Sequence, residues 1–389
     1  MPQYSIELQT TPHEMAREEI RKQVAFLSKN IQNVRFDGEG KHILFEAPQD
    51  HPEAVQDAVK KLATRIERAL RNVERKLVFR SSAAENPRFH ENPDLTGIHF
   101  LGTGQVALSG LPLRLYRYFD RVFEDFGRPW NPVPVLTPIL IPSGTLSRCD
   151  YFRSFPQSLT FAAHLTEDTQ LVENFRARHA TADDLDDQTL RDLDTPEACL
   201  SPAVCYHVYH LQQDCTVPSD GFAYSICGKC FRYESTNLSD LRRLWDFTMR
   251  EVVFLGSRDD VLKKRERSIT MMSEFLEAHK LAGEIRTASD PFFISPDAVS
   301  KTYFQLSSES KFEVSLLLPN GERTAVGSHN YHSDFFGCAF HTDVAEAGPM
   351  HSVCVAFGIE RWVHAFLHQH GSAPEHWPEP VRQAPEFHA

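Results

Sequence analysis

The stretch CFRYESTNLSDLRRLWDFTMREVVFLG, residues 230–256, decides which fold the sequence predicts. Two strand-like segments flank a charged loop, the pattern of two paired strands joined by a long turn. Charged and aromatic side chains alternate along it, among them Arg232, Glu234, Arg243 and Phe247. A guanidinium can grip a phosphate with its fork of donors, and an aromatic ring offers a flat surface to an adenine. The stretch therefore predicts a nucleotide triphosphate site on a sheet; the sequence holds no P-loop, which excludes a Walker-type site.

The composition is that of a globular protein, with 389 residues, 41% apolar and 24% charged. No apolar run approaches the roughly 18 residues of a membrane span, and the N-terminus lacks the basic-then-apolar order of a signal peptide. Eight cysteines without such a signal favour thiols or metal ligands over a disulfide framework. We therefore expect a cytoplasmic protein.

Periodicity divides the chain into a small module and one large unit. Residues 1–80 predict a β-α-β-β-α module, which could bind the acceptor of a reaction, and the polar residues 81–95 predict a linker. Residues 96–372 predict a mainly antiparallel sheet flanked by helices, and the proline-rich tail 373–389 is expected to be loose. The fold class is α+β.

Charge is unevenly distributed between these parts. The net charge of −12 argues against broad nucleic-acid binding, yet residues 1–80 hold 14 Lys and Arg against 12 Asp and Glu. The basic excess falls late in the module and indicates either a solvated helix face or a landing site for an acidic macromolecule. Its residues are Arg65, Arg68, Arg71, Arg75, Lys76 and Arg80.

Several further motifs resemble one known family. The opening stretch resembles motif 2 of the class II aminoacyl-tRNA synthetases, CVAFGIERWVHAFL at 354–367 resembles motif 3, and VPVLTPILIP, with Pro138, resembles motif 1. Together with LSPAVCYHVYH and SHNYHSDFFG, these motifs look like the amino acid:[carrier protein] ligases, shortened relatives of the zinc-dependent seryl-tRNA synthetases of methanogens. The resemblance spans roughly residues 100–370.

The resemblance implies a class II synthetase-like catalytic domain and a two-step reaction. ATP, with Mg²⁺, activates a small amino acid to an aminoacyl-adenylate, and the aminoacyl group passes to the phosphopantetheine thiol of a carrier protein. Carried over by position, Arg232 and Arg361 are the catalytic arginines of motifs 2 and 3. The other implied ATP-binding residues are Glu234, Arg243, Phe247 and Glu313, and the implied amino-acid-binding residues are Ser328 and Asn330.

The family also implies a zinc ion, and three positions match its ligands: Cys205, Glu251 and Cys354. Three protein ligands leave one open position on zinc, which the α-amine of an amino acid can fill. Cys227 and Cys230 in CGKC have ligand spacing and form the alternative metal site. Because they are three apart on a predicted strand, they are expected to face opposite sides.

The acceptor is the least constrained part of the hypothesis. A carrier protein is the first candidate, tRNA the second and a small-molecule amine the third, since the module at 1–80 is a departure from the short ligases. A catalytically inactive regulatory paralogue is the non-enzymatic alternative. The resemblance of 133–142 to motif 1 implies a homodimer.

Overall fold

The computed structural model describes residues 1–25, 27–28, 30–48, 52–70, 75–181, 185, 187–234, 238, 240–288 and 309–388. The first elements form a small module, a three-stranded sheet of order β1-β3-β2. Apolar side chains of both helices pack on it around the fully buried Ile43 and Phe45. The elements follow the order expected from the sequence: β1 (Gln3–Glu7), α1 (Glu14–Ala25), β2 (Gln32–Phe36), β3 (His42–Glu46) and α2 (Pro52–Leu70).

An eight-stranded sheet organises most of the remaining chain. Its strand order is β4-β14-β15-β16-β19-β13-β12-β7, and every pair is antiparallel except β12 with β7. The predicted antiparallel sheet with flanking helices is therefore confirmed. The strands are β4 (Leu77–Arg80), β7 (Val133–Val135), β12 (Phe222–Phe231), β13 (Asp246–Gly256), β14 (Gly283–Thr287), β15 (Lys311–Leu317), β16 (Arg323–Tyr331) and β19 (His351–Gly358).

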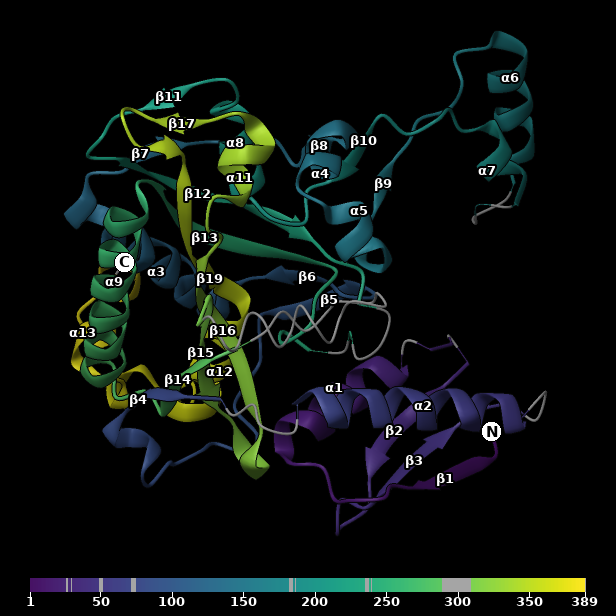
Figure 1. Cartoon of the computed structure of the whole chain (residues 1–389), viewed down its shortest axis with the longest axis horizontal. Helices are drawn as coiled ribbons and strands as arrows, with labels where there is room; N and C mark the ends of the chain where they lie inside the picture. Colours follow the sequence, from purple (N-terminus) through teal and green to yellow (C-terminus); the bar gives the residue numbers. More distant parts are fainter. Residues whose placement is uncertain are drawn as a thin grey trace.

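The two faces of this sheet are covered differently (Figure 1). Helices α3 (Gly110–Gly127), α9 (Arg258–Ala278) and α12 (Ile359–His370) pack on one face and build the largest apolar core. Alternate residues of the strands enter that core, as expected for period-two strands. Among the described elements, the short helices α8 (Cys205–Leu211) and α11 (Phe335–Phe340) pack on the opposite face.

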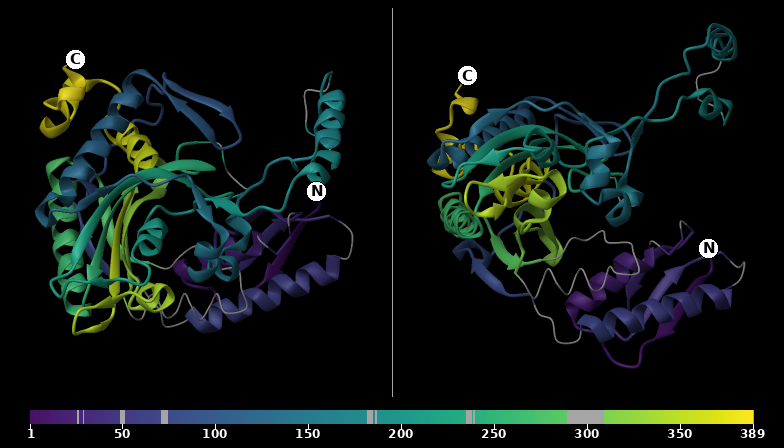
Figure 2. Two further views of the ribbon diagram at one scale, coloured as in Figure 1. Left: turned by 90° about the horizontal axis from the view of Figure 1, so that it is seen from above. Right: turned by 45° about the horizontal axis from the view of Figure 1, so that its top comes forward.

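Shorter elements fill the connections, and two of them project from the body. Helices α6 (Thr169–Arg178) and α7 (Asp187–Asp192) lie at the end of an arm that extends from β9 (Phe161–Ala162) and β10 (Ala198–Leu200), which belong to a separate three-stranded sheet of order β8-β10-β9 (Figures 1 and 2). The other strands and α-helices of the described residues are β5 (Ile98–Gly102), β6 (Gln105–Leu108), β8 (Leu140–Pro142), α4 (Ser143–Arg148), α5 (Tyr151–Ser154), β11 (Thr216–Val217), β17 (Asp343–Val344), β18 (Gly348–Pro349) and α13 (Glu379–Arg382).

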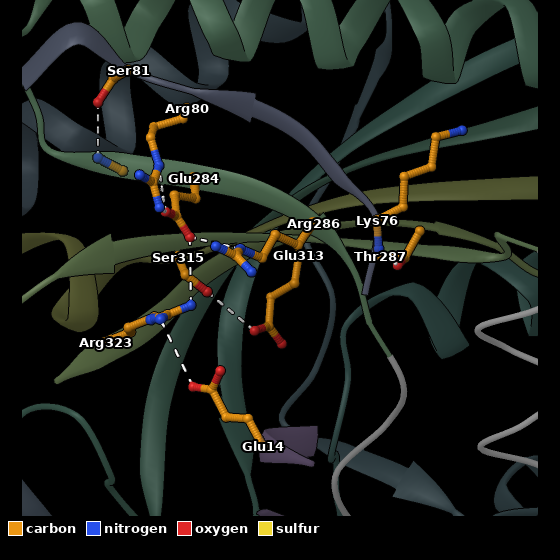
Figure 3. Close-up of polar contacts among 11 residues, drawn as sticks. Glu14, Lys76, Arg80, Ser81, Glu284, Arg286, Thr287, Glu313, Ser315 and Arg323 are labelled. Carbon is orange, nitrogen blue, oxygen red and sulfur yellow. Dashed lines mark hydrogen bonds and ion pairs between the residues drawn. The ribbon is translucent and has the colours of Figure 1, made fainter. Parts of the chain in front are cut away.

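The chain leaving the N-terminal module joins the large sheet before the expected linker begins. Strand β4, assigned from the sequence to the module, pairs with β14 instead. Ser81 Oγ then donates to the carbonyl of Leu281 at 2.7 Å. The same hydroxyl accepts from the amide of Gly283 at 2.9 Å (Figure 3). The start of the 81–95 segment is therefore fixed to the sheet edge, because an edge strand offers unpaired backbone groups.

The C-terminal tail is also more ordered than its proline content indicates. Trp377, Val381 and Ala384 are buried in the largest core, and the indole of Trp377 donates to the carbonyl of Gly371 at 3.0 Å. Arg121 on α3 pairs with Glu386 at 2.6 Å. The expectation of a loose tail is wrong, since its apolar side chains have a core to enter.

Across the described residues, no helix combines the length and the apolar character that a bilayer crossing demands.

Candidate functional site

One face of the large sheet collects most of the predicted site residues. Side chains of directly opposed residues point to the same face. Glu251 on β13 and Ser328 on β16 both lie opposite Ala356 on β19, and Glu313 on β15 lies opposite Ser328. Asn330 lies opposite Cys354 in the same way. We call this the site face; it is the one that α8 and α11 only partly cover.

Three candidate metal ligands meet at its centre. Glu251 and Cys354 come from neighbouring strands, and Cys205 is the first residue of α8, which packs on them. Their ligand atoms all lie within 4.8 Å of one another, and Cys354 Sγ lies 2.8 Å from Glu251 Oε2. We call these residues the metal triad. The metal triad cannot be derived from sequence spacing, because each ligand belongs to a different element.

The chemistry of the triad suits a soft divalent cation. All three residues are buried, and within the described part of the chain no Lys or Arg forms an ion pair with Glu251. Burial raises the pKa of the Glu251 carboxyl and that of the Cys354 thiol. A buried carboxylate without a cation is costly, and a metal ion would supply the missing positive charge. Two thiols and one carboxyl form a three-ligand set for zinc with an open fourth position.

The nucleotide-binding candidates begin one strand away. Arg232 follows β12 and donates through Nε to the carbonyl of Pro202 at 2.9 Å. Its guanidinium carbon lies 5.4 Å from the centre of the Phe247 ring, which projects from β13. Arg232 and Phe247 thus place a cation beside an aromatic ring. The cation is suited to a phosphate, and the ring is suited to a base.

Three more charged candidates lie near this pair. Arg243 Nη1 lies 3.4 Å from Glu234 Oε2. Arg361, on the first turn of α12, donates to the carbonyls of Arg242 at 2.7 Å and Ala325 at 3.0 Å. Burial lowers the pKa of Arg361, and the nearby charge of Glu234 opposes that shift. The structure therefore brings the motif 2 and motif 3 residues together across more than a hundred residues of sequence.

The candidate amino-acid contacts border the metal triad. Asn330 Nδ2 donates to Ser328 Oγ at 3.1 Å, while its buried Oδ1 has no hydrogen-bond partner among the described residues. Ser315 donates to Glu313 Oε1 at 3.2 Å, one strand further from the triad. An unsatisfied buried acceptor is a group that a substrate can pair with.

Two residues near the site were missed from the sequence. Buried Glu360 accepts from the amide of Thr248 at 2.8 and 2.9 Å, which fixes α12 and hence Arg361 against β13. Tyr209 stacks on Phe336 with ring centres 3.8 Å apart. Burial raises the pKa of Tyr209, as do the neighbouring thiols of the triad. Its spacing of four residues from Cys205 on a helix was the available signal.

The competing cysteine pair is divided by the sheet. Cys227 lies opposite Arg250, whose side chain reaches Asp120 on the core face, whereas Cys230 lies opposite Phe247 on the site face. The expectation that these two thiols face opposite sides is confirmed, so they do not converge on one ion.

Several known proteins are similar to this chain in sequence. No family model matches the chain. The amino acid–[acyl-carrier-protein] ligase 2 of Bradyrhizobium diazoefficiens is 35% identical over 242 residues, which cover 61% of the chain and 70% of that relative. The chain belongs to the amino acid–[acyl-carrier-protein] ligase family. It is therefore an enzyme that activates an amino acid, and the inactive-paralogue alternative is set aside.

The chain is also similar to seryl-tRNA synthetases, both in sequence and in fold. The type-2 serine–tRNA ligase of Methanopyrus kandleri is 27% identical over 297 residues, or 72% of the chain but only 56% of that relative's length. A solved structure of M. kandleri seryl-tRNA synthetase in complex with tRNASec from A. aeolicus superposes with a TM-score of 0.70 at 21% identity, covering 98% of the chain and 76% of the other. The class II synthetase-like fold is therefore confirmed.

Proposed function

We propose that this enzyme activates a small amino acid with ATP and passes the aminoacyl group to the phosphopantetheine thiol of a carrier protein. The observation that carries the proposal is the convergence of Cys205, Glu251 and Cys354 on the sheet face that also carries Arg232 and Phe247. A metal-held amine and a gripped α-phosphate on one face would place the amino-acid carboxylate next to the phosphorus.

Zinc, held by the metal triad, would bind the α-amine of the amino acid and leave the carboxylate free to react. Arg232 and Arg361 would stabilise the charge that builds on the α-phosphate, and Phe247 would support the adenine. Glu360 acts through Arg361, because it fixes the start of α12. Asn330 and Ser328 would orient the substrate beside the triad.

Magnesium would bind near Glu313, and Arg243 would hold the distal phosphates. A carboxylate is the kind of ligand Mg²⁺ prefers. Glu313 points from β15 on the site face and its Oε1 already accepts from Ser315. The pyrophosphate would leave past Arg243, whose guanidinium is tied to the protein through Glu234.

A carrier protein is the favoured acceptor because the family relatives are named for it and because of charge. The net charge is +2 for residues 1–80 and −14 for residues 81–389, which together give the total of −12. A part of the chain with so many excess acids is a poor surface for the many phosphate contacts that tRNA binding needs. A carrier needs one channel for its prosthetic arm. In this proposal residues 1–75 assist acceptor binding, and the large unit performs both chemical steps.

Aminoacylation of tRNA is the second candidate. The M. kandleri relative is named as a serine–tRNA ligase, and α2 here exposes Lys60, Arg65 and Arg68. Within the described part of the chain these cations form no ion pair. Arg71, also predicted for this basic face, lies outside the described residues, whereas Arg75 pairs with Glu18 at 2.9 Å and Arg80 with Glu284.

A homodimer through the edge of the sheet completes the proposal. Strand β7 forms the edge of the sheet opposite β4, and the chain around it exposes Val133, Leu136, Ile139 and Leu140. An edge strand with an apolar border is suited to a second copy of the chain.

The deciding assay supplies a labelled small amino acid and ATP, then a holo carrier protein, tRNA or hydroxylamine as acceptor. The proposal predicts that label is found on the carrier and is released when the thioester bond is cleaved. Label on tRNA with none on any carrier would favour the second candidate. Label captured only by the small amine would leave activation in place and remove both macromolecular acceptors.

A further inference from the structure

At the β4 edge of the site face, three arginines surround a single buried carboxylate. Arg80 Nε donates to Glu284 Oε1 at 2.8 Å, and Arg286 Nε donates to Glu284 Oε2 at 2.6 Å (Figure 3). Arg323 Nη1 approaches the same oxygen at 3.4 Å. Burial alone would raise the pKa of Glu284, but the hydrogen bonds from Arg286 and Arg80 outweigh it and lower that pKa.

Among the described residues, Glu284 is the one carboxylate that hydrogen-bonds to these three cations, so it balances one of the three charges. Arg323 also lies 3.9 Å from Glu14, whose side chain is 72% exposed, so water screens this pair. Glu313 lies opposite Arg286 in the register, yet its hydrogen bond goes to Ser315. The arginine cluster therefore retains positive charge at the edge of the site face.

The guanidiniums also retain free donors. Among the described residues, Arg286 donates to the protein through Nε alone, and the side chains of Arg80, Arg286 and Arg323 remain 47%, 26% and 37% exposed. A guanidinium fork fixed from behind by a carboxylate is preorganised for a phosphate oxygen in front. Buried Glu284 is thus the anchor for three partly exposed guanidiniums.

The distance from the arginine cluster to the metal triad is close to the length of a phosphopantetheine arm. Arg286 on β14 lies three strand spacings from Cys354 on β19, and two residues along the strand direction from its row. With spacings of about 4.8 Å and a rise of about 3.4 Å per residue, their backbones are about 16 Å apart. A phosphopantetheine arm has roughly thirteen bonds from phosphorus to sulfur, or about 15 Å at the reach of an extended chain.

We propose that Arg80, Arg286 and Arg323 bind the phosphodiester of the acceptor's phosphopantetheine arm while its thiol reaches the aminoacyl group beside the metal triad. This inference rests on the proposed function, because it requires a phosphopantetheine acceptor. The arm lies along the site face, across β15 and β16. The thiol sulfur attacks the carbonyl carbon of the aminoacyl-adenylate and gives up its proton to water. The thioester bond forms as the bond between that carbon and the phosphate oxygen breaks, and AMP leaves with the electrons of the broken bond.

The test compares two small thiols, 4′-phosphopantetheine and pantetheine, which differ only in the phosphate. The wild-type full-length enzyme should show a KM for thioester formation about tenfold or more lower with the phosphorylated thiol, the factor that a charge-assisted hydrogen bond commonly supplies. In Arg286→Gln the two KM values should converge, and in Arg286→Lys part of the difference should return. A ratio of KM values within one preparation cancels any loss of folded enzyme.

Arg258→Gln is the matched control, since Arg258 is an exposed arginine on α9, outside the site face. Its KM ratio should equal that of the wild type. A wild-type ratio near one, or a ratio that Arg286→Gln leaves unchanged, would overturn the inference while thioester formation itself still supports the proposed function. If neither thiol is acylated although amino acid is activated, the proposed function fails, and the arginine cluster loses this ligand with it.

Discussion

Glu251 and Glu284 are two buried carboxyl groups on the same face of the same sheet, and their surroundings differ completely. Glu284 is contacted by three arginines of the chain, whereas Glu251 contacts two thiols and no cation of the described chain. The pKa of Glu284 is lowered and that of Glu251 is raised. The charge of Glu284 is balanced by arginines of the chain, whereas in the proposed function the charge of Glu251 is balanced by a metal ion. The difference separates a carboxylate that the chain itself pairs from one that we propose a metal pairs.

The strongest test of the Glu251 half of this comparison removes one thiol. Cys354→Ser or Cys205→Ser should reduce bound zinc from about one per chain to near zero and abolish amino-acid activation, because two ligands hold the ion poorly. Cys338→Ser, at an exposed cysteine, is the matched control and should retain both. Metal content measured by mass spectrometry decides the outcome, and full zinc in both variants would remove the triad assignment.

The next largest effect concerns the phosphate side. Arg232→Ala should lower the rate of amino-acid-dependent ATP–pyrophosphate exchange by roughly two orders of magnitude, since a preorganised charge at the transition state is lost. Zinc content should remain close to one per chain, because the three ligands stay in place: Arg232 contacts Phe247 and Pro202, and it acts on Glu251 and Cys205 through its charge alone. Near-normal exchange in this variant would contradict the nucleotide-site assignment.

The two carboxyl groups should also differ in their effect on stability. Glu284→Gln should lower the free energy of unfolding by about 2–3 kcal/mol at pH 7, below the usual cost of breaking a buried pair because the guanidiniums are partly exposed. Glu251→Gln in chelator-treated protein should change it by less than about 1 kcal/mol, since no cation loses a partner. Urea unfolding of both variants and the wild type measures this.

Acid should remove the effect of Glu284. Its folded-state pKa is lowered, so its contribution is fully present above the unfolded value of about 4.3 and is lost as pH falls through the folded value. The difference in stability between the wild type and Glu284→Gln should therefore begin to shrink below about pH 4.3 and disappear as pH falls through the folded pKa. A constant difference between pH 7 and pH 3 would show that the charge of Glu284 is not what stabilises the β4 edge.

The smallest expected effect on activation comes from removing the N-terminal module. Deletion of residues 1–75 keeps β4, the Lys76 amide bond to Thr287 and the Arg80–Glu284 contact, so exchange should persist while transfer to a carrier falls. Deletion of residues 1–80 removes β4 as well and should lower Tm by several degrees. Equal Tm values for the two truncations would show that β4 adds little to the sheet.

Most of the candidate site residues could be predicted from the sequence, but the arginine cluster at the β4 edge of the site face could not. Motif residues such as Arg232 and Phe247 could be recognised because they lie close together along the chain. The metal triad depended on family resemblance, because its ligands come from α8, β13 and β19 and only folding brings them together. Nothing in the local pattern of Arg80 or Glu284 indicates their pairing, since it depends on β4 joining a sheet whose next strand begins about two hundred residues later.

The most direct measurement of the central claim is amino-acid-dependent ATP–pyrophosphate exchange before and after removal of the metal. A panel of single small amino acids identifies the substrate; the protein is then depleted with a chelator and reassayed, and zinc is restored. The account predicts exchange with the native protein, its loss on depletion and its recovery with about one zinc per chain. Undiminished exchange in metal-free protein would contradict the claim that Cys205, Glu251 and Cys354 hold the ion that binds the amino acid.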